Sequence, residues 1–476
     1  MKYKTLLTAA LICLSLSITG YTKATIKLPA YLSDNMVLQQ QSSNTIKGYG
    51  NKESDITLTT SWDGKKYTTK SNKKGYFEIT IETPSYGGPY DITITDGNTR
   101  STLKNILIGD VWLCSGQSNM EMPVKGFRGQ PVNNSHQAII AADSRRNLRL
   151  FTVKRAYSTT PADDMEGIWT KADSKNVSEF SAVAYFFGNM LENKLNIPIG
   201  LIHSSWSASK IEAWMDKETL SSFSEIDLSV LGNSEFGYPN GTPTLLYNAM
   251  IYPLHGLSVK GVIWYQGESN SSQPELYSRL FRSWVEQWRV FFANSQMPVY
   301  YTEIAPYQSS DKNDINLPLF RESQLKSMAE IPNIGMAFTT DIGNEKFIHA
   351  PEKQKVGERL AYWALAKTYG IEGFAYCGPV FNSMKMNGSI AELTFDYAQE
   401  GLNPENEPVK GFEIAGEDGV FTEAKAEIIN GSSVVKVWND SISVPAEIRY
   451  CFRNYTEGNL QNNAGFPAIS FRVRTK

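Results

Sequence analysis

The 476-residue sequence is poor in cysteine and histidine, with four of each. Cys13 lies in the N-terminal segment, and the other three cysteines, Cys114, Cys377 and Cys451, stand far apart. An odd number of thiols cannot be paired completely into disulfides, and this spacing matches no zinc-binding pattern. We therefore expect three buried thiols, no disulfide framework and no zinc site at these cysteines.

The sequence also lacks an excess of positive charge. Its 46 Lys and Arg residues against 49 Asp and Glu residues give a net charge of −3. Such a chain has no large positive field to attract phosphates, so we do not expect nucleic acid as a partner. With 41% hydrophobic and 20% charged residues, the composition is typical of an ordered globular protein.

Only the N-terminus carries a long uncharged run. Lys2 and Lys4 precede an uncharged stretch at residues 6–18, and residues 22–24 offer a cleavage site with small side chains. The run is shorter than the ~20 residues that a membrane-spanning helix needs. We predict a signal peptide at residues 1–24, export to the periplasm or the extracellular space, and no membrane insertion after its removal.

The rest of the chain changes its hydrophobic pattern twice. Residues 25–105 and 376–476 alternate polar and apolar side chains in short runs separated by turn residues, which predicts half-buried β-strands. We expect an N-terminal β-sandwich-like domain in the first zone and a C-terminal β domain in the second. The strands we expect there include residues 56–60, 76–81, 90–95, 433–438 and 446–452.

Residues 106–375 have a different pattern, in which short apolar runs alternate with segments of helical period. This pattern predicts an α/β domain with a parallel sheet, whose loops gather at the carboxyl edge. We expect a functional site at that edge. The expected strands are residues 261–265 and 297–301, and the expected helices are residues 182–195, 276–292 and 352–369.

One turn and one histidine are candidates for nucleophilic chemistry. The apolar run that begins at Gly109 ends near Met120 in a turn of small residues, where a serine hydroxyl could point outward as a nucleophile; an ordinary Gly-Ser loop is the alternative. His349 lies in a predicted strand-to-helix loop late in the chain, where a base is expected. His203 is its rival, with a loop-packing role as the alternative.

The two remaining histidines are less suitable. His136 stands in a polar segment that predicts a surface loop, and His255 follows a Tyr-Pro-Leu turn. Neither is expected at the carboxyl edge of the sheet.

Three blocks resemble, in the same order, the sialate O-acetylesterase family of SGNH-type serine hydrolases: Gly116–Met122, Trp264–Asn270 and Asp341–His349. The resemblance extends through nearly the whole mature chain. It implies a flavodoxin-like catalytic domain with flanking β domains. It also implies hydrolysis of O-acetyl esters on sugars without a metal or cofactor.

The resemblance implies roles for individual residues. Ser118 matches the nucleophile and His349 the general base, with an ordinary histidine pKa near 6.5. Gln266, Glu268 and Asn270 match the block that faces the nucleophile. We expect Gln266 or Asn270 to contact the oxyanion or the sugar, and Glu268 to brace the loop or to be a buried structural carboxylate.

Two departures from the family pattern affect the expected site. Lys346 and Phe347 stand where relatives carry an aspartate before the histidine, so the nearest matching acid is Asp341. A Ser-His dyad helped by a backbone carbonyl is the alternative to a triad with Asp341.

The second departure concerns the expected oxyanion loop. Ser207 and Ala208 replace a Gly-Gly pair, one of whose N–H groups is expected to complete the oxyanion hole. Ser and Ala keep the N–H donor but lack the conformational freedom of glycine.

We therefore expect an esterase whose partner is an O-acetylated carbohydrate, sialic acid or another glycan. The alternatives are an acetylxylan esterase, or a catalytically weakened glycan-binding protein that holds sugar with Trp206, Trp214 and Trp264. The sequence carries no signal for an oligomeric state.

Overall fold

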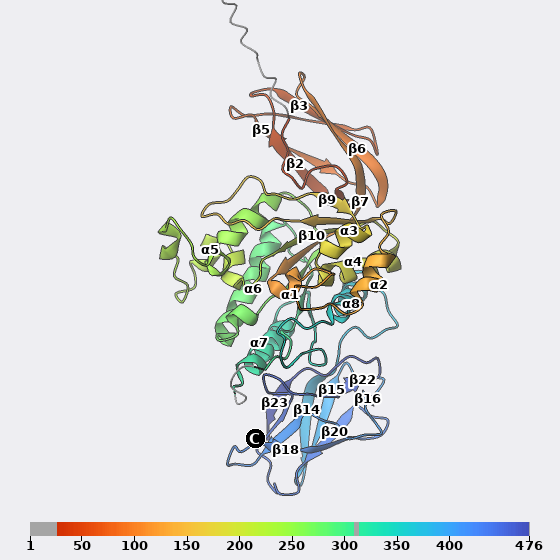
Figure 1. Ribbon diagram of the computed structural model, residues 1–476, viewed down its shortest axis with the longest axis vertical. Coiled ribbons are helices and arrows are strands. Elements are labelled where there is room, and N and C mark those ends of the chain that lie inside the picture. Colours follow the sequence, from red (N-terminus) through yellow and green to blue (C-terminus); the bar gives the residue numbers. More distant parts are fainter. Residues whose placement is uncertain (1–25, 309–313, 476) are drawn as a thin grey trace, which may run out of the picture.

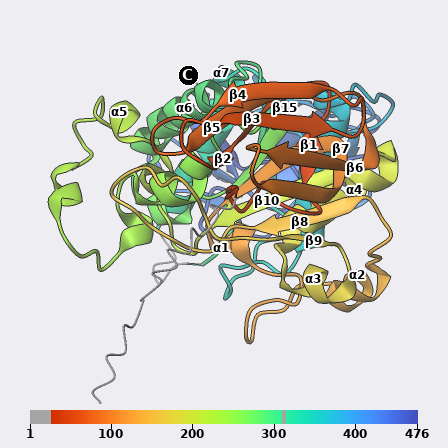
Figure 2. The same cartoon turned by 90° about the horizontal axis from the view of Figure 1, so that it is seen from above.

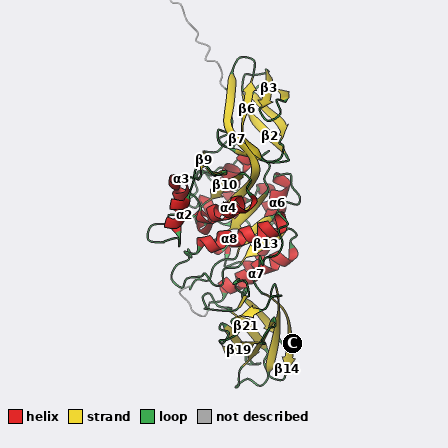
Figure 3. Ribbon diagram, turned by 90° about the vertical axis from the view of Figure 1, so that its right-hand side faces the viewer, coloured by secondary structure: helices red, strands yellow, loops and turns green. Residues whose placement is uncertain are grey.

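The computed structural model describes residues 26–308 and 314–475, which form three sections stacked along the long axis of the molecule (Figure 1). An N-terminal β section, a central section of strands and helices, and a C-terminal β section follow in chain order. All helices of the described residues lie in the central section (Figure 3). The predicted signal peptide, residues 1–24, lies outside the described residues.

The N-terminal section consists of strands with one buried face. In β5, Phe77, Ile79 and Ile81 are buried and the residues between them are more exposed, which confirms the predicted alternation. Figure 2 views this section along the long axis, over the central section. Its strands are β1 (Val37–Gln39), β2 (Ser43–Tyr49), β3 (Asp55–Thr60), β4 (Lys66–Lys70), β5 (Tyr76–Glu82) and β6 (Gly87–Thr95).

The central section is built on a parallel sheet with the strand order β13-β12-β11-β7-β10-β8-β9. All neighbours pair in parallel except β9, which is antiparallel to β8. Strands β10 to β13 are buried along their whole length, as parallel strands covered on both faces must be. The bounds are β7 (Arg100–Gly116), β8 (Leu148–Thr152), β9 (Trp169–Lys171), β10 (Ile199–Ser205), β11 (Gly261–Tyr265), β12 (Val299–Thr302) and β13 (Ile334–Ala337).

Helices cover both faces of this sheet, as two adjacent residues of β12 show. Tyr300 stacks on Trp363 of α8 at a ring distance of 6.3 Å, and Tyr301 meets Phe281 of α6 at 4.8 Å. Helices α4 and α8 pack together on the first face, and α6 and α7 on the second. The long helices are α4 (Ala182–Leu195), α6 (Pro274–Phe291), α7 (Asn316–Glu330) and α8 (Lys353–Trp363); the short ones are α1 (Ser118–Glu121), α2 (Ser135–Ala141), α3 (Ser174–Glu179) and α5 (Lys217–Leu220).

The predicted helices are confirmed, with one change at a helix end. Helix α4 has the predicted bounds, and α6 begins two residues earlier than predicted. The predicted helix at residues 352–369 ends as an α-helix at Trp363 and continues as a π-helical turn at Ala364–Thr368.

Strand β7 joins the N-terminal and central sections without a break. It has 17 residues; its first half pairs with β6 and β1, and its second half with β10 and β11. The expected boundary between residues 105 and 106 therefore falls inside a strand. Asn105 there has a positive φ of 56° and lies at a register shift between β7 and β6. The two sections share one hydrophobic core.

The buried carboxylate of Asp110 fastens this junction. Its Oδ1 accepts hydrogen bonds from Gln39 Nε2 at 2.7 Å and Gln40 Nε2 at 3.0 Å. Its Oδ2 accepts one from the hydroxyl of Tyr369 at 2.8 Å. A buried carboxylate needs such hydrogen-bond donors. Asp110 therefore holds together strand β1, the residue after it and the segment that follows α8.

The C-terminal section has its own hydrophobic core, separate from the shared one. It contains two four-stranded antiparallel sheets and one two-stranded sheet, which confirms the predicted strands near residues 433–438 and 446–452. The strands are β14 (Val380–Asn387), β15 (Ile390–Asp396), β16 (Leu402–Asn403), β17 (Phe412–Ala415), β18 (Thr422–Glu423), β19 (Lys425–Ile428), β20 (Val434–Trp438), β21 (Glu447–Tyr450), β22 (Gln461–Asn462) and β23 (Phe471–Arg474).

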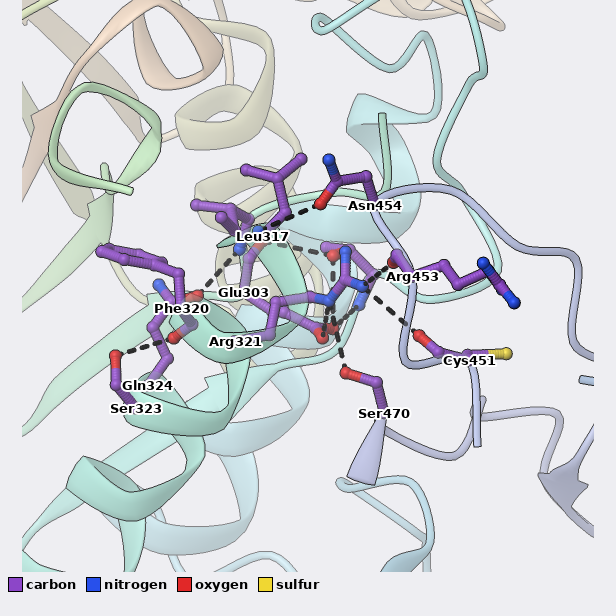
Figure 4. A network of polar contacts seen from close by, with 12 residues as sticks. Glu303, Leu317, Phe320, Arg321, Ser323, Gln324, Cys451, Arg453, Asn454 and Ser470 are labelled. Atoms are coloured by element: carbon purple, nitrogen blue, oxygen red, sulfur yellow. Dashed lines mark hydrogen bonds and ion pairs between the residues drawn. The ribbon is translucent and has the colours of Figure 1, made fainter. Parts of the chain in front are cut away.

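A buried arginine connects the central and C-terminal sections (Figure 4). Arg321 of α7 is 1% exposed, and its Nη2 donates to the carbonyl of Arg453 at 2.7 Å. Its Nε donates to Ser470 Oγ at 3.3 Å and lies 3.7 Å from Glu303 Oε1. Arg321 therefore neutralises a buried carboxylate of the central section and donates hydrogen bonds to the C-terminal section.

The three cysteines among the described residues, Cys114, Cys377 and Cys451, are free and buried, as predicted. No helix in the described part of the chain is both long enough and apolar enough to cross a bilayer.

We predict that Arg321→Met lowers the free energy of unfolding by about 3–5 kcal/mol, because it leaves Glu303 buried without a counterion. The matched control is Arg472→Met, which breaks an ion pair with Glu322 whose side chains are 39% exposed on each side. Exposed pairs contribute only about 0–1 kcal/mol. Urea unfolding of the three proteins compares them, and equal midpoints for the two variants would contradict the prediction.

Candidate active site

Ser118 lies where β7 leaves the sheet. The last residue of β7, Gly116, has a φ of 145°, and a Cβ there would lie 2.1 Å from the carbonyl oxygen of Tyr265. Only glycine allows this close approach of β7 to β11. The N–H of Gln117 then donates to the same carbonyl at 2.9 Å, and α1 begins at Ser118, which is 8% exposed. The serine is thus held at the carboxyl edge of the sheet.

His349 lies in the loop between β13 and α8, and its ring is half-buried. Its Nδ1 is 2.5 Å from Oε1 of Gln130, which belongs to the loop after α1. The ring of Phe127, from the same loop, meets the imidazole edge to face at 5.4 Å. His349 is therefore oriented by residues that are remote in the sequence.

Asn119 brings the loops of Ser118 and His349 together. Its Nδ2 donates to the carbonyl of Ile348 at 3.2 Å and to Glu268 Oε1 at 2.6 Å. Its neighbours in the chain are Ser118 on one side and the rest of α1 on the other, while Ile348 directly precedes His349. The two predicted catalytic residues therefore flank a single hydrogen bond.

A buried lysine completes this arrangement. The ammonium of Lys353, which is 0% exposed, donates to Asn119 Oδ1 at 2.6 Å and to the carbonyl of Ala350 at 2.7 Å. Burial lowers the pKa of Lys353 to about 7, while the Glu268 carboxylate opposes the shift. Burial raises the pKa of Glu268, whose Oε2 is buried without a hydrogen-bond partner among the described residues. Glu268 thus braces the loops, as expected.

Asp341 does not contact the imidazole of His349 in this structure. Its two carboxylate oxygens accept hydrogen bonds from Arg359 Nη1 and Nη2, each at 2.7 Å. Lys355 lies 3.9 Å from the same carboxylate. Asp341 therefore ties its loop to α8, and the hydrogen-bond partner of His349 Nδ1 is Gln130, neither the expected carboxylate nor a backbone carbonyl.

The two residues of the expected oxyanion loop differ in what they offer. The N–H of Ser207 donates to Glu121 Oε2 at 2.8 Å, and its hydroxyl binds the same oxygen. Ala208 is exposed and has a φ of 55°, and its N–H meets no acceptor among the described residues. Only the Ala208 N–H is therefore available to a ligand.

Glu121 is itself held from the other side. Arg155 Nε donates to its Oε1 at 2.6 Å, and the Arg155 guanidinium lies 5.7 Å from the ring of Trp206. Arg155, Glu121 and Ser207 thus form a chain of contacts from the rim of the site to the oxyanion loop.

Gln266 and Asn270 support that loop from below. Gln266 Nε2 donates to the carbonyl of Ser209 at 3.0 Å and to Asn270 Oδ1 at 2.8 Å. Asn270 Nδ2 donates to Glu212 Oε2 at 2.8 Å, and its Oδ1 also accepts from the N–H of Ile211 at 3.1 Å. The Nε2 of Gln266 and the Nδ2 of Asn270 thus donate within the core, while Gln266 Oε1 is buried without a partner among the described residues. The expected contact of either amide with the oxyanion or the sugar stays a prediction.

The other histidines occupy different environments. His203 is buried against Phe180, with Nε2 2.5 Å from Ser205 Oγ, in agreement with a packing role. His136 and His255 are exposed. Burial lowers the pKa of His203 to about 4.

The tryptophans proposed as a sugar platform are mostly core residues. Trp214 and Trp264 are 0% exposed, in contact with each other at 6.3 Å. Only Trp206 remains at the surface of the site. The glycan-binding alternative therefore loses two of its three aromatic residues.

Sequence reasoning missed Gln130, Glu121 and Lys353. All three are polar residues in loops or at helix ends; Glu121 lies in the block Gly116–Met122, whereas Gln130 and Lys353 lie outside the three blocks. An i+3 spacing from Ser118 on a short helix could have drawn attention to Glu121. No signal in the sequence indicates that Gln130 meets His349.

Comparisons with known proteins identify the relatives of this chain. Residues 108–366 match the family described as carbohydrate esterase, sialic acid-specific acetylesterase. The mouse (Mus musculus) sialate O-acetylesterase is 28% identical over 448 residues, which cover 82% of each chain. The human (Homo sapiens) enzyme is 28% identical over 425 residues, covering 82% of this chain and 80% of that one. A crystal structure of a carbohydrate acetylesterase from Xanthomonas citri superposes with a TM-score of 0.85 and 34% identity, covering 95% of this chain and all of that chain.

The first prediction from this site concerns Ala208. A non-glycine residue in the left-handed region costs roughly 1–2 kcal/mol, so Ala208→Gly should keep or raise acetyl ester turnover. Ser207→Gly should lower turnover, because the loop loses its hydroxyl contact with Glu121. Hydrolysis rates of acetyl, propionyl and butyryl esters measure both effects; a faster Ser207→Gly enzyme with an unchanged Ala208→Gly enzyme would reverse this interpretation.

The second prediction concerns pH. Burial, together with the Lys353 charge, lowers the pKa of His349 to about 4, below the 6.5 expected from the sequence. Because the base must be neutral, kcat/KM should fall as the pH drops through about 4. Lys353→Met removes the repelling charge, so the pKa of His349 and the acid limb should move to higher pH.

The matched control is Lys355→Met, on the same helix, whose side chain is 50% exposed. Its acid limb should coincide with that of the parent. If the pH profiles of kcat/KM for Lys353→Met and Lys355→Met have the same acid limb, the Lys353 charge does not lower the pKa of His349, whatever the absolute rates of the two variants.

Proposed function

The chain belongs to the sialic acid-specific acetylesterase family of carbohydrate esterases, and we propose that Ser118 is the nucleophile and His349 the general base of its reaction. The chain hydrolyses O-acetyl esters on sugars. The observation that supports the residue assignment is the hydrogen bond from Asn119 to the carbonyl of Ile348, because it joins the residue after Ser118 to the residue before His349.

In the first half of the reaction, Ser118 Oγ attacks the acetyl carbonyl carbon while His349 Nε2 takes the hydroxyl proton. The tetrahedral intermediate collapses when the C–O bond to the sugar breaks. His349 delivers its proton to the departing sugar oxygen, which leaves as an alcohol. An acetyl group remains on Ser118.

In the second half, water replaces the serine in the same sequence of steps. His349 takes a proton from the water as its oxygen attacks the acetyl carbon. The second intermediate releases acetate, and the proton returns from His349 to Ser118 Oγ. The free enzyme is regenerated without any external reductant or oxidant.

We propose that the backbone N–H groups of Ser118 and Ala208 stabilise the negative oxygen of both intermediates. In the described part of the chain, neither N–H has a hydrogen-bond partner. The Ser207 N–H is engaged by Glu121, which supports Ala208 as the second donor. Each such donor contributes about 10²–10³-fold to the rate of acyl transfer.

The strand order supports a flavodoxin-like SGNH fold for the catalytic domain. Leaving β8 aside, the strands β10-β7-β11-β12-β13 follow the order 2-1-3-4-5, which is that of flavodoxin-like sheets. The order reverses between β7 and β11, and Ser118 follows β7 directly. We propose that the catalytic domain ends near residue 375 and is followed by the C-terminal β domain, whereas on its N-terminal side strand β7 is shared with the N-terminal β section.

We also propose that the chain is exported, to the periplasm or the extracellular space. The support is the pattern of residues 1–24, in which two lysines precede an uncharged run and a small-residue cleavage site. Export would place the enzyme where acetylated glycans occur as polymers. Detection of mature protein that begins near Thr25 outside the cytoplasm tests this proposal.

The sugar can be sialic acid or a neutral glycan such as acetylxylan. Acetate release from O-acetylated sialic acid and from acetylxylan, measured in parallel, distinguishes the two. Release from neither substrate, and none from an aryl acetate, would favour a glycan-binding protein that has lost turnover.

We predict that Ser118→Ala lowers aryl acetate hydrolysis by about 10⁴-fold or more without loss of folding, because a nucleophile and its base act as a unit. His349→Ala should lose as much. His255→Ala is the matched control, since His255 is exposed and remote from the sheet edge. Circular dichroism verifies folding. A Ser118→Ala enzyme whose rate of aryl acetate hydrolysis stays within tenfold of the parent rate would contradict the assignment of Ser118 as the nucleophile.

A further inference from the structure

We infer that Gln130 is the positioning residue of the catalytic histidine, in the place where a serine hydrolase usually has a carboxylate. The inference rests on the proposed function of Ser118 and His349. It is carried by the contact between Gln130 Oε1 and His349 Nδ1 at 2.5 Å. Neither Asp341 nor Lys346 can take this place, because Asp341 is bonded to Arg359 and a lysine has no acceptor.

The chain holds Gln130 in a defined turn. The N–H of Gln130 donates to the carbonyl of Phe127 at 2.9 Å, which closes a four-residue turn. Gly126 precedes it with a φ of 82°, and a Cβ there would lie 2.4 Å from the Gln130 carbonyl oxygen. The turn therefore requires glycine at this position, and the Gln130 side chain starts from a fixed backbone.

The same loop is anchored to the segment that follows His349. The N–H of Asn133 donates to the carbonyl of Pro351 at 3.0 Å, and its Nδ2 donates to Glu352 Oε1 at 2.6 Å. Asn134 Nδ2 donates to Gln354 Oε1 at 3.0 Å. Gln130 and His349 thus belong to two segments that are joined again directly after their contact.

The chemistry of the contact selects one tautomer. An amide oxygen can only accept a hydrogen bond, so the proton of the neutral imidazole is on Nδ1. Nε2 then carries the lone pair that takes the proton from Ser118 Oγ. Gln130 fixes the ring and the tautomer but, being neutral, adds no charge to stabilise the imidazolium that forms.

The carboxylates near His349 are engaged by other groups, so none of them is bonded to its ring. Lys353 of α8 repels the imidazolium, and Glu268 of η6 (Glu268–Asn270) lies behind Lys353. Glu352 is bonded to Asn133, and Asp341 to Arg359. In this environment a carboxylate at position 130 would be the only negative group bonded to the ring.

The test compares Gln130→Ala and Gln130→Glu with the parent, using an aryl acetate over a range of pH. Gln130→Ala should lower kcat by ~10–100-fold, as the loss of a partner that orients a histidine does, with KM within about twofold of the parent, because Gln130 acts through His349. Gln130→Glu should keep kcat near the parent value at pH 8. Its acid limb should move up by about 1–3 pH units, since an adjacent carboxylate raises a histidine pKa.

Asn134→Ala is the matched control, because it removes an amide contact between the same loop and α8 without touching His349. Its kcat and its acid limb should equal those of the parent. An equal loss of kcat in Gln130→Ala and Asn134→Ala, or a Gln130→Glu profile with an unmoved acid limb, would show that Gln130 only anchors the loop.

The outcome for Ser118→Ala separates this inference from the proposed function. If Ser118→Ala loses activity and Gln130→Ala does not, the inference fails and the proposed function stands. If Ser118→Ala keeps activity, the proposed function fails first. If Gln130→Ala does not fold, the inference is tested by Gln130→Glu alone, through the position of its acid limb relative to that of the parent.

Discussion

The active-site geometry depends on the burial of one charge. The ammonium of Lys353 is fully inaccessible, and a buried cation must find acceptors or lose its proton. Its acceptors are Asn119 next to Ser118 and the carbonyl of Ala350 next to His349. The need to satisfy one ammonium therefore holds the nucleophile loop and the base loop together, and the same charge lowers the pKa of the base.

In the loop of Ser207 and Ala208, hydrogen bonds hold a conformation that a glycine pair would adopt more freely. The N–H and the hydroxyl of Ser207 both donate to the Glu121 carboxylate. Gln266 and Asn270 form hydrogen bonds with the backbone of this loop from the core side. These bonds leave Ala208 in a left-handed conformation that glycine adopts more easily. The serine and alanine at this position are thus part of a supported loop, in which the Ala208 N–H has no acceptor among the described residues.

The two β sections are attached to the central one by different means. Strand β7 is shared between the N-terminal section and the central sheet, so the two have a common core. The C-terminal section has a separate core and meets the central section at the buried Arg321 (Figure 4). An N-terminal boundary drawn from pattern alone falls inside a strand, because side-chain alternation does not register which sheet each half of a strand joins.

The sequence by itself determined the elements and selected Ser118 and His349 as the proposed reacting residues. Strands and helices such as β5 and α4 follow from the periodicity of near neighbours, and Ser118 and His349 follow from motifs at the ends of strands. Tertiary structure alone decided which polar groups meet. Asp341 accepts hydrogen bonds from Arg359, and Gln130 contacts His349. Gln266 and Asn270 form hydrogen bonds with the backbone of the segment that follows Ala208. The reason is physical, since hydrogen bonds in the site depend on how loops pack in space, and Gln130 and His349 are 219 residues apart in the chain.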